Sequence, residues 1–163
     1  MLSAQETVLV HIADGLAQYV AFRLSAFERE QALSPDSESP RANLLTLDVL
    51  DGRAEAARAG FSQISDEITR TWGIAVSEHS LGHAAESKRA LQELITHHAQ
   101  DNAYWIATAY AWRGEKDKAM EWLDRAYRQR DSGLGDVKVD QFFASARGDP
   151  RFKAILRKMK LPE

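Results

Sequence analysis

Apolar residues recur at intervals of three and four along most of this chain. Between Leu9 and Phe27 they stand at positions 9, 12, 16, 19, 20 and 27, which is the spacing of one face of an amphipathic helix. Gly15 is a candidate break in that helix. The same periodicity predicts helices over residues 42–50, 54–65, 68–80, 84–98, 103–112 and 116–128. Few segments alternate with a period of two, so no strands are expected.

Proline and glycine mark the boundaries between these predicted helices. Residues 34–40, which include Pro35 and Pro40, consist of types that favour turns or solvent, so a loop is expected there. Gly52, Gly82 and Gly114 each stand between two helical patterns, 30 and then 32 residues apart. A fixed period in this range is typical of stacked-repeat proteins. Glycine suits a tight reversal between helices because a positive φ costs it little.

The clearest copy of the repeat lies between residues 102 and 131. Its pattern is Ala103-x₂-Ile106-Ala107-x₂-Tyr110, then Gly114, then Ala119-x₃-Leu123-x₂-Ala126. This pattern resembles the tetratricopeptide repeat (TPR), in which small residues let two helices approach and large residues fill the space between repeats. The resemblance implies an all-α fold of antiparallel helix pairs, stacked as a short right-handed solenoid.

The repeats predict one domain over residues 1–163. It divides into a degenerate N-terminal helical region (1–39), three TPR-like repeats (40–131) and a C-terminal cap (132–163). Asp149 and Pro150 are a typical helix start. After them Phe152, Ile155, Leu156 and Met159 share one apolar face, and we expect this helix to cover the last repeat.

A second resemblance covers the C-terminal part of the chain. Residues 110–131, followed by residues 149–162, look like the C-terminal TPR region of certain bacterial proteins. In that group the repeats are often attached to a cyclase, a kinase or a winged-helix regulator. The resemblance therefore implies a bacterial protein-interaction module.

Composition and charge narrow the class of protein. Hydrophobic residues make up 44% and charged residues 28% of the chain, as in soluble globular domains. The lack of cysteine excludes disulfides, thiolate zinc sites and a cysteine nucleophile, and it suits a reducing cytoplasm. The net charge of −3 gives no general attraction to nucleic acid. The most apolar stretch, residues 8–27, contains His11, Asp14, Gln18 and Arg23 and is too polar to span a membrane.

The C-terminal residues are locally basic. Residues 125–163 hold ten Lys and Arg against five Asp and Glu. An anionic partner could bind there, but aromatic residues are not interleaved with the basic ones. A solvated outer helix face is therefore the favoured interpretation.

The sequence contains few candidates for catalysis. His79 and His83 have a metal-ligand spacing, but Gly82 lies between them and is expected to end the helix, so the two side chains should diverge. No nucleophile or phosphate-loop motif is present, and Gly133-Leu-Gly135 lacks the third glycine of a dinucleotide site. We therefore expect no enzymatic activity, no cofactor and no metal.

The TPR resemblance implies a concave groove lined by the first helix of each pair. In this register the groove residues are Thr46, Trp72, Val76, His79, Tyr104, Thr108 and Trp112. Three of these are aromatic and could anchor a partner, although each could instead pack against a neighbouring helix. The clamp with which some TPRs hold acidic chain ends would fall on Ala42, Thr46, Gly73, Asp101 and Trp105, none of which supplies a cation.

Two functions follow as expectations. The first is a non-catalytic protein–protein interaction module that binds a peptide or helix in the groove. The second is a self-associating element that forms a homodimer through its N-terminal helix, with Leu9, Ile12, Leu16 and Tyr19 as candidate contacts. A ligand-binding helical domain is a third and less favoured interpretation.

Overall fold

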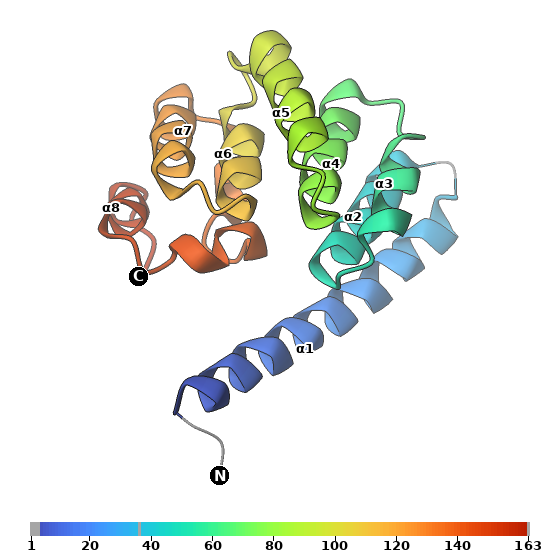
Figure 1. Cartoon of the computed structure of the whole chain (residues 1–163), viewed down its shortest axis with the longest axis horizontal. Coiled ribbons are helices and arrows are strands. Elements are labelled where there is room, and N and C mark those ends of the chain that lie inside the picture. The colour runs from blue at the N-terminus through green and yellow to red at the C-terminus, as the bar shows by residue number, and fades with distance from the viewer. Residues whose placement is uncertain (1–3, 36, 163) are drawn as a thin grey trace.

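The computed structural model describes residues 4–35 and 37–162, with side chains from residue 17 onward. These residues form an all-α fold without strands (Figure 1). The α-helices and 3-10 helices (η) in chain order are α1 (Ala4–Leu33), α2 (Glu38–Leu50), α3 (Ala54–Phe61), α4 (Glu67–Ser80), α5 (Ala84–His98), α6 (Ala103–Trp112), α7 (Lys116–Gln129), η1 (Ser132–Asp136), η2 (Gln141–Ala146) and α8 (Pro150–Lys158). The predicted all-α class is confirmed.

The predicted boundaries agree with the structure for α5 and α6 and lie within one residue for α4 and α7. The loop predicted over residues 34–40 is wrong in its last part, because α2 already begins at Glu38 and buries Pro40 in its first turn. Proline is tolerated there because a first-turn amide has no acceptor within the helix. The Glu38 carboxylate also accepts hydrogen bonds from the amides of Ser65 and Asp66, joining the start of α2 to the start of α4.

Helix α1 continues through residue 15 without the break that Gly15 suggested. A single glycine inside a helix costs only about 1 kcal/mol relative to alanine, which a long helix tolerates. The second half of α1 packs on α2, where Val20 is buried and Leu24 and Phe27 are partly buried.

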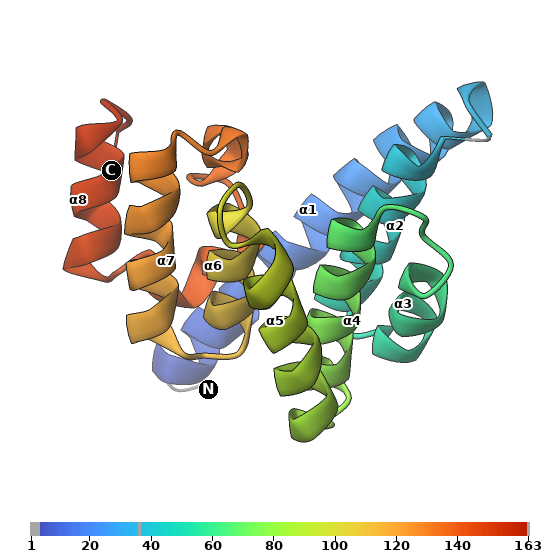
Figure 2. The same cartoon turned by 90° about the horizontal axis from the view of Figure 1, so that it is seen from above.

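Helices α2, α4 and α6 form a row, which we call the inner row. Each packs against the helix that follows it, and α4 also contacts both α2 and α6. Figure 2 shows α4, α5, α6, α7 and α8 following one another across the molecule. A side chain on α2, α4 or α6 can therefore face the same side of the molecule although these helices are far apart in sequence.

The turns that end α2, α4 and α6 have one common geometry. Gly52, Gly82 and Gly114 have φ of 79°, 81° and 75°, a conformation that other residues rarely adopt. After α2, the amide of Gly52 donates to Val49 O and that of Arg53 to Asp48 O, and the same two bonds recur after α4 and α6. This is the Schellman arrangement, so the role expected for the three glycines is confirmed.

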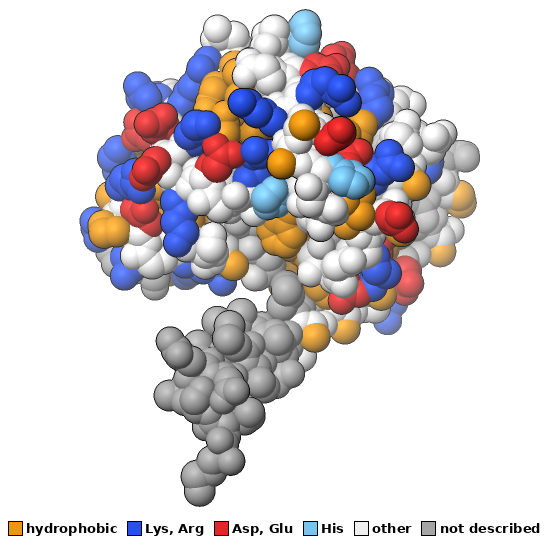
Figure 3. Space-filling model, viewed as in Figure 1, with side chains coloured by type: hydrophobic (Ala, Val, Ile, Leu, Met, Phe, Trp, Pro, Cys, Tyr) orange, Lys and Arg blue, Asp and Glu red, His pale blue; other side chains and the backbone are white. Residues whose placement is uncertain are grey.

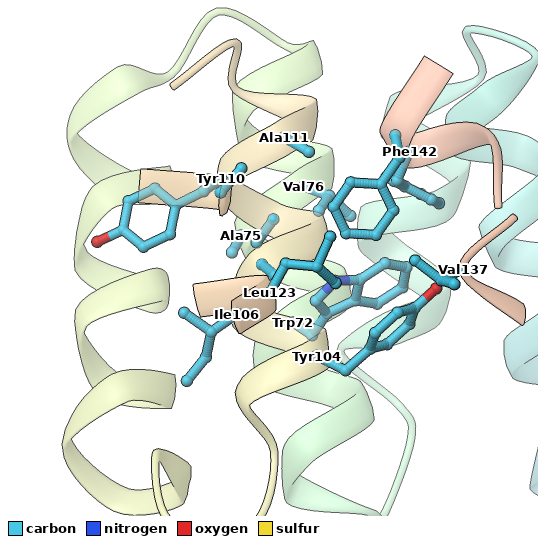
Figure 4. Packing of buried hydrophobic residues seen from close by; sticks show 14 of the residues in the cluster. Trp72, Ala75, Val76, Tyr104, Ile106, Tyr110, Ala111, Leu123, Val137 and Phe142 are labelled. Carbon is cyan, nitrogen blue, oxygen red and sulfur yellow. The ribbon is translucent and has the colours of Figure 1, made fainter. Parts of the chain in front are cut away.

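Small buried residues let the two helices of each pair approach closely. Ala57, Ala75, Ala107 and Ala119 are completely buried, and larger apolar side chains such as Leu123 fill the remaining space around them (Figure 4). The expected small positions at Ala107 and Ala119 therefore lie in the core.

The last helix, α8, begins as predicted. The Asp149 carboxylate accepts a hydrogen bond from the amide of Arg151 at 2.8 Å, and Pro150 is the first helical residue. Phe152, Ile155 and Leu156 are buried, and α8 contacts α7.

Candidate functional site

A cavity of about 190 Å³ lies on the inner row. Four of the residues predicted to face a groove line it: Thr46 of α2, Trp72 of α4, and Tyr104 and Thr108 of α6. Tyr19, Arg23 and Phe27 of α1 form another wall. The remaining lining residues are Asn43, Leu47, Leu50, Trp105, Gly133, Asp136, Val139, Asp140, Gln141 and Phe142.

One wall of the cavity comes from residues 131–147, which we call the crossing segment. It follows α7, contains η1 and η2, and both of these contact α6. Phe142 is buried against two rings of the inner row. Its ring centroid lies 5.1 Å from that of Trp72 (Figure 4) and 5.1 Å from that of Trp112. The crossing segment therefore covers part of the face that was predicted to be an open groove.

Most of the Trp72 side chain is committed to the core. Its Nε1–H donates to Thr108 Oγ1 at 2.9 Å, and its ring also lies near Phe61 and Trp105. Trp72 and Thr108 are each only 2% exposed. They form the floor of the cavity and present little surface to a partner.

Three other predicted groove residues do not line the cavity. Val76 has no exposed surface, so in this structure it cannot touch a partner. Trp112 packs on Phe142 and donates its Nε1–H to Ser80 Oγ at 2.9 Å. His79 is half-buried, and its pKa lies below the ordinary value because burial and the nearby Arg113 charge disfavour the protonated ring.

Aspartates hold the crossing segment against α6. Asp140 Oδ2 accepts a hydrogen bond from the Tyr104 hydroxyl at 2.7 Å, while its Oδ1 caps η2 by accepting from the amide of Phe142. Asp131 accepts from the amides of Tyr104 and Gly133. The N-cap residues of both short helices, η1 and η2, are therefore hydrogen-bonded to the same tyrosine.

Burial changes the ionisation of this pair. It raises the pKa of Asp140, against the lowering effect of the hydrogen bonds from Tyr104 and Phe142. It also raises the pKa of Tyr104, and the neighbouring Asp140 charge adds to that effect. The phenol therefore stays protonated and remains a donor to the carboxylate.

Two charged groups, Arg23 and Asp136, line the cavity near its rim. The Arg23 guanidinium lies 4.6 Å from the Phe27 ring centroid and 5.9 Å from that of Tyr19. Within the part of the chain whose side chains are described, Arg23 and Asp136 make no ion pair. Val139, beside them, is 55% exposed. These groups are available to a ligand in a way that Trp72 is not.

The sequence patterns did not indicate that the α1 wall and the crossing segment are parts of a site. One signal was present: Asp131, Asp140 and Asp149 are spaced nine residues apart, and each accepts from the amide two residues later at the start of a short helix. Aspartate before a helical turn is a typical N-cap. That spacing could have indicated two further helical turns between α7 and α8.

The residues predicted for self-association are only partly described. The side chains of Leu9, Ile12 and Leu16 lie outside the described residues. Tyr19 is half-buried and lines the cavity. On the same helix Phe22 is 74% exposed and Leu33 is 85% exposed.

The basic C-terminal residues are partly neutralised. Arg151 pairs with Asp149 and Asp117, and Lys158 pairs with Asp124. Figure 3 shows basic and acidic side chains interspersed on the viewed face. This arrangement agrees with the interpretation of a solvated outer surface.

Two further properties concern only the described residues. No three His, Asp or Glu side chains among them come together as a metal site. None of their helices combines the length and the apolar character that a bilayer span requires.

Comparison of the chain with protein-family models, with curated proteins and with solved structures gives no match.

Proposed function

We propose that this chain is a non-catalytic protein-interaction module with a short, TPR-like right-handed solenoid. The support for the architecture is the inner row of α2, α4 and α6 together with the recurring glycine turn between the two helices of each pair. Each pair buries its apolar face only by stacking on its neighbours, as repeat proteins do.

The observation that carries the function is the cavity on the inner row. An apolar cavity of about 150 Å³ can hold a benzene ring, so the 190 Å³ here suits one large side chain and is too small for a whole helix. Because the crossing segment already covers the Trp112 side of the row, we propose that a partner peptide or helix lies across α1 and α2. It would insert one anchor side chain between Thr46, Phe27 and Trp105.

A peptide selection with a cavity-filling variant tests this function. A random peptide library displayed on phage is selected on the wild-type protein, and the recovered peptides are titrated against Thr46→Trp. The matched control is Thr96→Trp, because Thr96 is exposed on α5 and, like Thr46, donates its hydroxyl to the carbonyl four residues earlier.

We expect Thr46→Trp to weaken peptide binding by about tenfold or more, since loss of one buried anchor is worth at least ~1.4 kcal/mol. Thr96→Trp should bind like wild type, and melting curves confirm that both variants fold. Recovery of no peptide, or of peptides that bind both variants equally, would refute the cavity as the binding site.

Self-association through α1 is a second candidate, favoured by the exposure of Phe22 and Leu33 on that helix. Light scattering coupled to size-exclusion chromatography tests it. A dimer that becomes a monomer in Phe22→Asp, but not in Ala21→Asp, would support this function. Ala21 is also exposed but lies about 100° around the helix from Phe22. A monomeric wild-type protein at high concentration would exclude it.

A further inference from the structure

The walls of the cavity are unusually rich in aromatic rings. Tyr19 and Phe27 come from α1, Trp72 and Trp105 from α4 and α6, and Phe142 from the crossing segment. The π-face of an aromatic ring carries partial negative charge and attracts cations within about 6 Å of its centroid. The structure contains one such contact already, because the Arg23 guanidinium lies 4.6 Å from the Phe27 centroid.

The charges that line the cavity also favour a cationic ligand. Two carboxylates, Asp136 and Asp140, line it, against one cation, Arg23. Both carboxylates also act on the opposite wall: burial raises the pKa of Tyr19 most, Arg23 lowers it, and Asp140 and Asp136 raise it further. Arg147, whose guanidinium donates to the carbonyls of Val139 and Asp140, lowers the Tyr19 pKa with a smaller effect than these groups. An acidic ligand would meet Arg23 but would also be repelled by two carboxylates.

We propose that the anchor side chain accepted by this cavity is cationic, a lysine or an arginine of the partner. Its alkyl stem would lie along Trp105 and Phe27, and its charged end would face Asp136 and Asp140. This inference rests on the proposed function and adds the chemical class of the partner residue. Asp136 is the stronger candidate for direct contact, because it is exposed and unpaired within the described residues, whereas Asp140 already accepts two hydrogen bonds.

Arg23 has a defined part in this proposal. It is the chain's own cation at the cavity rim, held by the rings of Phe27 and Tyr19 without an ion pair to any described residue. A ligand cation would compete with it for the same aromatic surface and be repelled by its charge. Removal of the Arg23 charge should therefore strengthen binding, while removal of the Asp136 charge should weaken it.

Small cations test the proposal directly. The probes are n-butylguanidinium and n-butylammonium, with n-pentanol as a neutral compound of similar size, each titrated while the indole N–H signals are followed by NMR. We expect both cations, but not pentanol, to shift the signals of Trp72 and Trp105. Trp122 is the internal control, because it does not line the cavity and is covered by Arg125.

The two charge variants should change the affinity for the cations in opposite directions. We expect Asp136→Asn to weaken cation binding by about two- to fivefold and Arg23→Gln to strengthen it by a similar factor, the range of partly exposed charge pairs. Neither should change the response to pentanol. A structural disturbance of the cavity would instead weaken binding in both variants.

Two results would overturn the inference: pentanol binding as tightly as the cations, or weaker cation binding in both variants. The peptides selected above separate this failure from failure of the proposed function. If the selected peptides bind Thr46→Trp more weakly than wild type and yet share a neutral or acidic anchor residue, that result would support the proposed function and refute the cationic anchor. Absence of any cavity-dependent peptide would refute the function itself.

Discussion

The two halves of the inner surface differ in what covers them. Over α4 and α6, Phe142 of the crossing segment fills the space between Trp72 and Trp112, and Asp140 is bonded to Tyr104. Beside α1 and α2 the same surface remains open as a cavity, with Arg23 at its rim.

This difference separates the inner residues that stabilise the fold from those that remain accessible. In the covered half the aromatic rings have each other as neighbours, and their polar atoms are hydrogen-bonded to Thr108, Ser80 and Asp140. In the open half, Arg23 and Asp136 lack ionic partners among the described residues. The aromatic stripe on the inner helices is thus a poor guide to the proposed binding surface, because it belongs mostly to the core.

Removing the ring that fills the covered half should lower the free energy of unfolding more than the other substitutions below. Phe142→Ala removes a buried ring from between two tryptophans, and such a truncation costs about 3–5 kcal/mol through lost burial and the cavity left behind. Urea unfolding followed by tryptophan fluorescence measures this cost as a change in the free energy of unfolding.

The control for this variant is Val139→Ala, in the same segment but 55% exposed, which should change stability by no more than about 0.5 kcal/mol. If Phe142→Ala instead costs less than about 1 kcal/mol, the crossing segment does not pack on α6 in solution, and both halves of the inner surface are open.

A smaller effect should follow from pushing the crossing segment away from Tyr104. A Cβ added at Gly133 would lie 2.3 Å from Cδ1 of the Tyr104 ring, and that ring is held by the hydrogen bond to Asp140. We expect Gly133→Ala to cost about 1–3 kcal/mol, as overpacking does. Thermal and urea unfolding provide the measurement.

Gly135 is the matched control in this segment. A Cβ there would meet nothing within 4 Å, so Gly135→Ala should be neutral or stabilising by up to about 1 kcal/mol, because alanine restricts the unfolded chain. Equal costs for the two alanine variants would mean that the close approach to Tyr104 is absent.

The helices could be predicted from the sequence because their signals are local. The ends of α5 and α6 follow from periodicity and from the glycine turns beside them, and Asp149 with Pro150 marks the start of α8. The start of α2 was missed because a buried proline in a first turn looks like a loop residue until the contact of Glu38 with the α4 cap is known.

The candidate site could be predicted only in part. Thr46, Trp72, Tyr104 and Thr108 were placed on one face by their register, and they do line one cavity. Neither Phe142 nor the α1 wall could be assigned, because their positions depend on contacts between segments far apart in sequence rather than on periodicity. Val76 was misplaced for a related reason: a register position identifies the face of a helix but not what covers it.

The smallest expected effect is a change in stability with pH, caused by the carboxyl group of Asp140 in the covered half. Burial raises the folded-state pKa of Asp140, with Asp136 raising it further and Arg147 lowering it. A carboxyl whose pKa is higher in the folded than in the unfolded state binds its proton more tightly when folded, so its contribution to stability falls as the pH rises.

Wild type should therefore gain stability relative to Asp140→Asn as the pH is lowered from neutral towards the ordinary pKa of unfolded aspartate, about 3.9. Asparagine keeps one oxygen that can cap η2 but loses the second acceptor, which binds the Tyr104 hydroxyl. The pH dependence of the stability difference, and not its size, therefore reports the charge. Asp136→Asn removes a neighbouring charge that raises the pKa of Asp140, and should therefore reduce this pH dependence without abolishing it. A pH-independent difference between wild type and Asp140→Asn would show that the carboxylate is solvated, and hence that the crossing segment does not seal the covered half.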